Sequence, residues 1–367
     1  MASTRENQAR DFVLLCSLEK LTETKLYLLL EQFKTPEAII NASFSALAEI
    51  VGSEIAHRIG ELKPNDEIKR KWDTLEQHQI KVIPYYDEEY PDWLKIIPNF
   101  PPVLFVRGNI KPEDEVALGV VGTRGATIYG KSIAEEFAGK FARAGVCVVS
   151  GMARGIDTSA HWGAIKNKGR TIAVLGCGVD IAYPPENRTL MEEIVKCGAV
   201  ISEFNIRTPP LAQHFPKRNR IIAGLSKAIV AIEAKERSGV MNTVEWALQQ
   251  SKEIFAIPGN IYSKTSAGTN RLIKEGAIPV TSAEEVLDYL GIKFTRKERE
   301  IKEMVLNEEE KKVWEGLSYE PIYLDALKER IDMPTGEILK ILLGLEIKGL
   351  IKQLPGMMFV KNFEKEG

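Results

Sequence analysis

The chain of 367 residues has few of the residues that hold metals or cross-links. Its four cysteines, Cys16, Cys147, Cys177 and Cys197, include no C-x-x-C pair, and its four histidines lack the spacing of metal ligands. This pattern argues against a disulfide framework and against a zinc site. We therefore expect buried, reduced thiols and no metal.

Long hydrophobic runs and a strong net charge are also missing. No apolar run approaches the ~18 residues that cross a bilayer, and the sequence does not open with a signal-peptide pattern. We expect a cytoplasmic chain with no membrane contact. The 49 basic and 51 acidic residues leave a net charge of -2. A nucleic-acid site would therefore have to arise from local segregation of charge.

The N-terminal part reads as a run of short helices. In residues 1–75, apolar residues recur at steps of three and four, as in KLYLLLEQF and SFSALAEIV, with Thr35 and Ser43 as expected N-caps. The stretch ALAEIVGSEIAHRIG indicates two helices around a glycine turn. Such a module, of the SAM or helix-hairpin-helix type, could contact a DNA phosphate or serve only for packing.

From Val82 the pattern changes to apolar strands that alternate with helices. Near-continuous apolar runs of this kind are typical of strands buried on both faces. The alternation predicts a doubly wound, Rossmann-like, mostly parallel α/β sheet over residues 76–291. The strand-like runs after residue 115 are VALGVVG, VCVVSGM, TIAVLGCG, AVISEF, KAIVAIEA and EIFAIPG.

Beyond the sheet, residues 292–308 read as a charged linker and residues 309–367 as a winged helix. Three helical patterns followed by LIKQLPGMMFVKN predict the three helices and the hairpin. Residues 301–367 hold 10 basic and 13 acidic residues. A helix that reads DNA should be locally basic, so this charge favours a structural or protein-contact role for the wing.

The stretch GVVGTRGATIYG, residues 119–130, lies where a dinucleotide-binding protein has its glycine-rich turn. However, the G-x-G-x-x-G spacing is absent, Arg124 occupies the turn, and the second strand ends in Ser150-Gly151 without an acidic residue. No G-x-x-x-x-G-K-[ST] motif occurs either. These differences argue against a dinucleotide or nucleotide cofactor, and we expect no cofactor.

The loop after the fourth strand gives the sharpest charge signal. From Phe204 to Ile232 the 29 residues contain no Asp or Glu but five Lys or Arg residues. Cationic groups beside an aromatic ring are what single-stranded nucleic acid requires, because the cations contact phosphates and a base stacks on the ring. Alternatively, Phe215 is a core residue and the arginines are ordinary surface charge.

The motifs together resemble the DNA-processing protein A family (DprA, or Smf) over about residues 82–291. They are GVVGTRGATIYG, SGMARGIDTSAHWGAI, FPKRNRIIAGLS, IEAKERSGVMNTVEWAL and PGNIYSKTSAGTNRLIKEGA. The resemblance implies a homodimer that binds and protects incoming single-stranded DNA during natural transformation and helps to load the RecA recombinase. It implies no catalytic residues.

The resemblance also implies site residues. Arg124 corresponds to a phosphate-binding arginine and Phe215 to a base-stacking aromatic, with basic contacts beside them. Some members have a lysine where this chain has Ala212, and Lys217 could replace that contact. The full candidate set, which includes polar residues from the other strand-end loops, is Gly122, Thr123, Arg124, Arg154, Arg188, Phe215, Lys217, Arg218, Asn219, Arg220, Ser238, Gly239 and Asn270.

An enzymatic alternative remains. Nucleotide phosphoribohydrolases of the lysine-decarboxylase-like family carry P-G-G-x-G-T-x-x-E with a catalytic glutamate. Here the corresponding stretch is RSGVMNTVEWA, with Thr243 and Glu245 one position too close and two glycines missing. Glu245 could equally be a carboxylate that suits the first turns of a helix.

Overall fold

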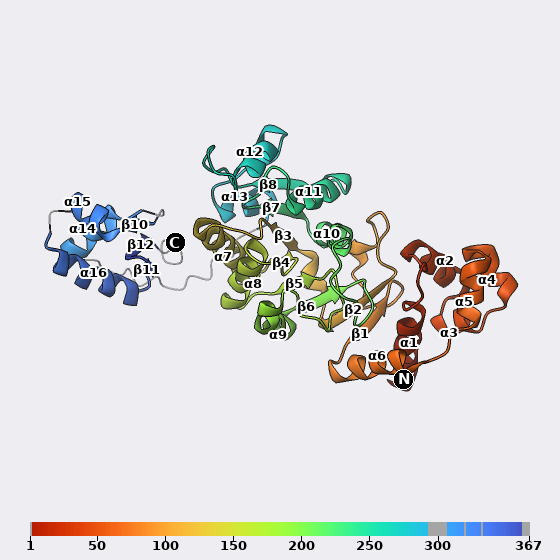
Figure 1. Cartoon of the computed structure of the whole chain (residues 1–367). Helices are drawn as coiled ribbons and strands as arrows, with labels where there is room; N and C mark the ends of the chain where they lie inside the picture. Colours follow the sequence, from red (N-terminus) through yellow and green to blue (C-terminus); the bar gives the residue numbers. More distant parts are fainter. Residues whose placement is uncertain (1, 293–306, 319–320, 332, 362–367) are drawn as a thin grey trace.

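The computed structural model describes residues 2–292, 307–318, 321–331 and 333–361. The predicted charged linker over residues 292–308 lies almost entirely outside the described residues. Within the described parts, no helix has both the length and the apolar character that a membrane span requires. The helices and strands form an N-terminal helical group, a large mixed α/β unit and a small C-terminal unit (Figure 1).

The N-terminal group contains six helices whose starts follow from capping side chains. The Thr35 hydroxyl accepts from the Ala38 amide and the Ser43 hydroxyl accepts from the Ala46 amide, which confirms both expected N-caps. Gly52, at φ 85°, forms the turn between the fourth and fifth helices. The helices are α1 (Ala2–Leu15), α2 (Glu23–Phe33), α3 (Pro36–Ile40), α4 (Phe44–Val51), α5 (Ser53–Gly60) and α6 (Asp66–Gln77).

A nine-stranded sheet follows, with the order β1-β2-β6-β5-β4-β3-β7-β8-β9. The pairs β1–β2 and β2–β6 are antiparallel and all the others are parallel, so the predicted mostly parallel sheet is confirmed. The strands are β1 (Lys81–Pro84), β2 (Val103–Gly108), β3 (Ala117–Val121), β4 (Cys147–Ser150), β5 (Thr171–Val174), β6 (Ala199–Ser202), β7 (Ala228–Ala231), β8 (Glu253–Ala256) and β9 (Ile278–Pro279).

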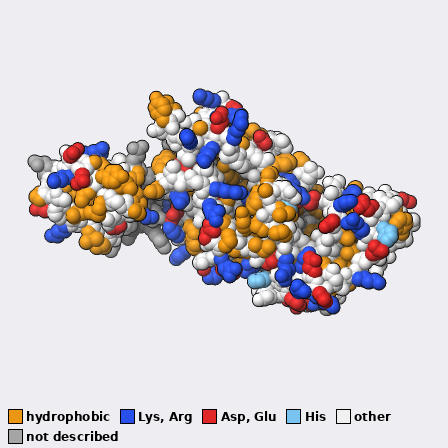
Figure 2. Space-filling view, in the orientation of Figure 1, with side chains coloured by type: hydrophobic (Ala, Val, Ile, Leu, Met, Phe, Trp, Pro, Cys, Tyr) orange, Lys and Arg blue, Asp and Glu red, His pale blue; other side chains and the backbone are white. Residues whose placement is uncertain are grey.

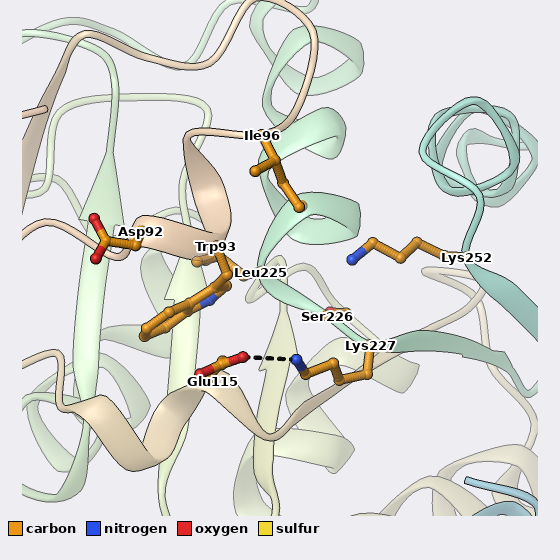
Figure 3. Close-up of a pocket in the computed structure, with 9 residues that line it drawn as sticks. Asp92, Trp93, Ile96, Glu115, Leu225, Ser226, Lys227 and Lys252 are labelled. Carbon is orange, nitrogen blue, oxygen red and sulfur yellow. Dashed lines mark hydrogen bonds and ion pairs between the residues drawn. The ribbon is translucent and has the colours of Figure 1, made fainter.

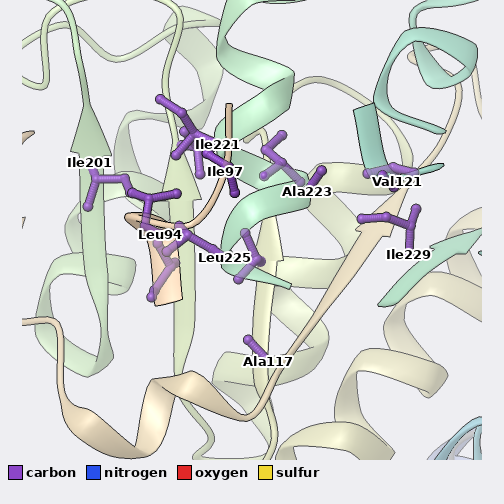
Figure 4. Packing of buried hydrophobic residues seen from close by; sticks show 14 of the residues in the cluster. Leu94, Ile97, Ala117, Val121, Ile201, Ile221, Ala223, Leu225 and Ile229 are labelled. Atoms are coloured by element: carbon purple, nitrogen blue, oxygen red, sulfur yellow. The ribbon is translucent and has the colours of Figure 1, made fainter. Parts of the chain in front are cut away.

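Helices cover both faces of the sheet because the strands are apolar on both faces. Along β3, Ala117 and Val121 belong to one buried cluster, whereas Leu118 and Val120 belong to another, as the two-residue period of a strand requires. Figure 4 shows the first cluster, in which side chains of β3 and β7 lie beside those of α10. The connecting helices are α7 (Ile128–Arg143), α8 (Ile156–Lys166), α9 (Arg188–Cys197), α10 (His214–Leu225), α11 (Gly239–Gln249), α12 (Ala267–Lys274) and α13 (Ala283–Tyr289).

The C-terminal unit has the helices and the hairpin of a winged helix, as predicted. Val313, Leu327 and Leu342 form its core, one from each helix. The elements are α14 (Glu308–Gly316), β10 (Ile322–Tyr323), α15 (Leu324–Arg330), α16 (Thr335–Ile347), β11 (Ile351–Leu354) and β12 (Met358–Lys361).

The order in which strands are added to the sheet changes direction at β3. It proceeds from β3 through β4 and β5 to β6 on one side, and then returns to place β7, β8 and β9 on the other side of β3. Ligands of open α/β sheets bind at such a switch point, outside the carboxyl ends of the strands. The loops that follow β3 and β7 therefore define the place where a site is expected.

Candidate nucleic-acid interface

Phe215 and Arg124 meet at the carboxyl ends of the strands. The Arg124 guanidinium carbon lies 5.3 Å from the centre of the Phe215 ring, although the two residues follow different strands, β3 and β6. Phe215 lies on the first turn of α10 and also contacts the Tyr183 ring at a centroid distance of 5.4 Å. Gly176 lies against the Phe215 ring: a Cβ atom there would lie 3.0 Å from the ring, which would have to shift by a few tenths of an ångström. Phe215 is half-buried and Arg124 is exposed.

The glycine-rich turn around Arg124 already holds a carboxylate of the protein. Glu233, buried at the end of β7, accepts hydrogen bonds from the Thr127 amide at 2.9 Å and the Thr127 hydroxyl at 2.6 Å. The Thr123 amide donates to the Glu233 carbonyl at 2.7 Å. A carboxylate suits this position because it faces the N-terminus of α7. Glu233 therefore occupies the amide at the N-terminus of α7, and the Arg124 side chain remains exposed beside it.

Arg218 lies inside the protein and contacts backbone carbonyls. Its side chain is 4 % exposed and donates to the Gly151 carbonyl at 2.9 Å and to the Val174 carbonyl. A Cβ atom on Gly151 would lie 2.6 Å from the guanidinium nitrogens, so only glycine leaves room for this side chain. Arg218 also lies 5.9 Å from the Phe215 ring centre. In this position it supports the ring and offers no free face to a phosphate.

A buried carboxylate accompanies Arg218. Asp157, at the start of α8, accepts from the amides of Gly151 at 3.2 Å and Ala153 at 3.3 Å. Burial raises the pKa of Asp157 to about 6, although the charge of Arg218 and these amides act in the opposite direction. Burial lowers the pKa of Arg218 to about 10, so the guanidinium remains a cation at neutral pH.

Lys217 and Arg220 form ion pairs with two glutamates that lie outside the acid-free segment. Arg220 is 3 % exposed and lies 2.7 Å from the Glu203 carboxylate. Lys217 pairs with Glu23 of α2 and lies 3.7 Å from Glu203. Burial opposes ionisation of Glu23, but its hydrogen bond to Lys217 holds the pKa below the ordinary value. Arg220 is thus buried in an internal ion pair and Lys217 is paired as well, so a contact of either cation with DNA stays a prediction.

The N-terminus of α11 carries an unpaired polar side chain. The Ser238 hydroxyl oxygen is buried and has no hydrogen-bond partner among the described residues, and it does not cap the helix. Asn219 of α10 donates to the Gly239 carbonyl at 3.5 Å and to the Asn242 side chain at 3.1 Å, which joins the two helices. This helix terminus, which follows β7 at the switch point, has donors suited to an anion.

The remaining predicted DNA-binding residues differ in exposure and in how many of their polar groups already have partners within the protein. Thr123 is 7 % exposed and its hydroxyl accepts from the Gly125 amide at 3.3 Å. Arg154 is exposed but pairs with Glu186. Arg188 is exposed at the first position of α9. Asn270 uses its amide internally, donating to the Gly259 carbonyl at 2.9 Å and accepting from the Gly259 amide at 3.1 Å.

Two cavities lie away from the Arg124–Phe215 pair. One of about 280 Å³ lies near the amino ends of β3, β7 and β8, where the Lys227 and Glu115 side chains pair at 2.9 Å and Lys252 points inward (Figure 3). The other, of about 470 Å³, is lined by Glu245 of α11 and by three further carboxylates and three cations. These residues are Glu236, Glu253, Glu275, Arg237, Lys252 and Arg271.

Glu245 itself is exposed on α11, and the cavity that it lines also reaches Ser238 at the start of that helix. Within the described residues, no group of three or more His, Cys, Asp and Glu side chains could hold a metal ion.

Sequence reasoning missed Glu233, Glu23 and Tyr183. Glu233 organises the turn that presents Arg124, Glu23 pairs with Lys217, and Tyr183 packs on Phe215. A buried acid at the end of an apolar strand was the one available signal for Glu233. No local signal pointed to Glu23, which lies 194 residues before Lys217.

Comparison with known proteins places the chain in a family. The family described as DNA recombination-mediator protein A matches residues 81–291, and the DprA winged helix domain matches residues 299–357. Protein Smf of Escherichia coli K12 is 37% identical over 301 residues, 80% of each chain. The DNA processing protein DprA of Bacillus subtilis is 40% identical over 212 residues, which cover 58% of this chain and 71% of that protein.

Two solved structures agree with this assignment. DNA processing protein A from Streptococcus pneumoniae matches with a TM-score of 0.67 and 32% identity, over 76% of this chain and 97% of that one. The protein from Helicobacter pylori, whose structure concerns its single-stranded DNA binding mode, matches with a TM-score of 0.53 and 28% identity, over 58% and 95%. The chain therefore belongs to the DNA-processing protein A family.

Proposed function

We propose that this protein binds single-stranded DNA along the carboxyl ends of its parallel strands, protects it, and passes it to a RecA recombinase during natural transformation. The observation that carries the proposal is the contact between Arg124 and Phe215, 5.3 Å apart beside the switch point of the sheet. A half-buried ring next to an exposed guanidinium can stack a base while the cation contacts the adjacent phosphate.

The other interface residues divide into outward-facing and supporting groups in this proposal. Arg188 faces outward and contributes charge, and the start of α11 at Ser238 and Gly239 offers hydrogen-bond donors to a phosphate. Arg218 and Asn219 fix α10 and thereby hold Phe215 in position. Because stacking and phosphate contacts do not distinguish base edges, we expect little sequence preference.

The protein acts, in this proposal, as a cytoplasmic homodimer without catalysis. The relation to the Helicobacter pylori protein supports binding of single-stranded DNA. The RecA contact, transformation and dimer formation rest on the family resemblance alone. Hydrolysis of nucleotides by Glu245 is the competing proposal. It is less favoured than DNA binding because Glu245 is exposed and three further carboxylates line the same cavity.

The test is a titration of fluorescent single-stranded oligonucleotide against duplex of equal length, at several salt concentrations. We expect a preference for the single strand, binding that weakens with salt, and a loss of about 5- to 150-fold in Phe215→Ala, since base stacking contributes ~1–3 kcal/mol. Phe215→Tyr is the matched control that keeps a ring. Absence of binding at low salt, with turnover of nucleoside monophosphates that Glu245→Gln abolishes, would replace this proposal by the enzymatic one.

A further inference from the structure

The loop over residues 257–266, between β8 and α12, exposes two large apolar side chains at its tip. Tyr262 is 90 % exposed and Ile261 79 %, and Tyr262 has the highest exposure of any large hydrophobic residue in the described parts of the chain. Figure 2 shows hydrophobic side chains projecting from the upper edge of the molecule, close to Lys and Arg side chains over α12. At this exposure the Tyr262 ring is open to a partner.

Hydrogen bonds within the loop order its backbone around the exposed tip. The Tyr262 amide donates to the Asn260 side chain at 2.9 Å, and the Ser263 amide donates to the Asn260 carbonyl at 2.9 Å. At the base of the loop, Asn270 binds both the amide and the carbonyl of Gly259. An aromatic side chain on a preorganised loop loses little conformational entropy when a partner covers it.

The same loop is hydrogen-bonded to the element that presents Arg124. The Thr265 hydroxyl donates to the Glu233 carboxylate at 3.3 Å, and the Ala234 amide donates to the Thr265 carbonyl at 2.7 Å. Glu233 in turn accepts from Thr127 in the turn after Arg124. The tip therefore belongs to the same edge of the sheet as the proposed DNA interface.

The distance along this edge can be judged from the strand order. Gly176, which Phe215 contacts, follows β5, and the loop follows β8, four strand spacings away in the order β5-β4-β3-β7-β8. At about 4.8 Å per spacing, the ends of β5 and β8 are separated by about 19 Å along the sheet. The start of α11, with Ser238, follows β7 and lies between them.

The exposed charges around the tip favour an anionic partner. The loop contributes Lys264 and no acid, and the exposed part of the neighbouring loop after β7 contributes Lys235 and Arg237 against Glu236, whereas Glu233 is buried there. The other four side chains are exposed. An exposed ring beside surplus cations is the arrangement that single-stranded nucleic acid uses, with bases on rings and phosphates on cations.

We infer that Tyr262 is a second base-stacking position, and that a single DNA strand runs from Phe215, past the start of α11, to the tip of the β8–α12 loop. The inference rests on the proposed function, because it extends that interface. Ile261 provides apolar surface beside the ring, and Lys264 contacts the backbone of the strand.

A length series of fluorescent oligothymidylates tests this with the full-length protein. Short oligonucleotides reach only Phe215, whereas longer ones also reach Tyr262. For long oligonucleotides, Tyr262→Ala should weaken binding about fivefold or more, and Tyr262→Phe should bind as the wild type does. For the shortest oligonucleotides that bind, Tyr262→Ala should have no effect, whereas Phe215→Ala should weaken binding at every length.

The outcomes separate the two proposals. If Phe215→Ala weakens binding and Tyr262→Ala leaves it unchanged at all lengths, the second stacking position is wrong and the proposed function stands. If neither substitution matters, the proposed interface itself fails. If Tyr262→Ala lowers the molar mass in light scattering without DNA and weakens binding equally at all lengths, the tip is a subunit contact and this inference is overturned.

Discussion

Replacement of Arg124 by alanine tests the proposed interface at an exposed cation. Arg124 is exposed, its guanidinium lies 5.3 Å from the Phe215 ring centre, and the turn that carries it is fixed by hydrogen bonds to Glu233. Removal of the side chain should therefore leave the backbone of the turn in place. It deletes one positive charge and one cation–π contact.

The expected magnitude follows from the chemistry of one phosphate contact. A hydrogen bond to a charged group contributes about 1.5–3 kcal/mol, which corresponds to a loss of roughly 10- to 150-fold in affinity. Each phosphate contact to a single strand contributes about -0.7 to the slope of log K against log salt concentration. We therefore expect weaker binding at low salt and a slope that is flatter by about 0.7.

The assay is a salt titration of single-stranded oligonucleotide binding, with two matched variants. Arg124→Lys keeps the charge and should keep the slope of the wild type. Arg143→Ala removes an exposed arginine from the C-terminal end of α7, the helix that follows the Arg124 turn, and should change neither quantity. An Arg124→Ala slope equal to that of the wild type would refute a phosphate contact. A salt-independent loss would show instead that Arg124 acts only by packing on Phe215.

Three further predictions concern the surroundings of the interface. In the wild type, Glu23 pairs with Lys217. Glu23→Gln should therefore free this lysine for a phosphate and steepen the salt slope by up to about 0.7 in the same titration. An unchanged slope would mean that Glu203 still holds the lysine. Burial lowers the pKa of His161 from 6.5 to about 3. The contribution of this neutral side chain to folding stability is therefore complete above pH 6.5 and is lost as the pH falls towards 3. In urea unfolding, the wild type should lose about 2 kcal/mol of unfolding free energy between pH 7 and pH 5 through this residue, at 1.36 kcal/mol per pKa unit. His161→Gln should not show this loss. Equal losses in both proteins would contradict the prediction. Deletion of residues 301–367, which are net acidic, should leave most of the single-strand affinity, and a large loss would assign DNA contacts to the wing.

The alternation of apolar strands with helices was sufficient to predict the sheet, because every strand of a doubly wound sheet is apolar on both faces. Arg124 and Phe215 were identified from motifs, and the structure brings them into contact. The role of Glu233 could not be predicted in the same way. It depends on β7 lying beside β3, a pairing between segments more than 100 residues apart.

The charge count along the acid-free segment could not reveal the internal partners of its cations. A count along the chain detects only local acids, whereas Lys217 and Arg220 are neutralised by Glu23 from the N-terminal helices and by Glu203 just before the segment. The backbone carbonyls that accept from Arg218 are equally invisible to such a count. Cations within a helix that packs on a sheet need internal partners whenever their side chains are buried.

This distribution of charge makes the salt slope of the wild-type protein informative. Six basic residues at the predicted interface, all bound to phosphates, would give a slope of about -4 at 0.7 per contact. In the structure, Arg218 and Arg220 are buried, Lys217 and Arg154 are ion-paired, and Arg124 and Arg188 are exposed. Two phosphate contacts, or three if Lys264 takes part, would give about -1.4 to -2 per bound strand. A shallow slope with a large effect of Phe215→Ala is therefore the expected signature of an interface in which stacking outweighs charge. A slope near -4 would require the internal ion pairs to open when DNA binds.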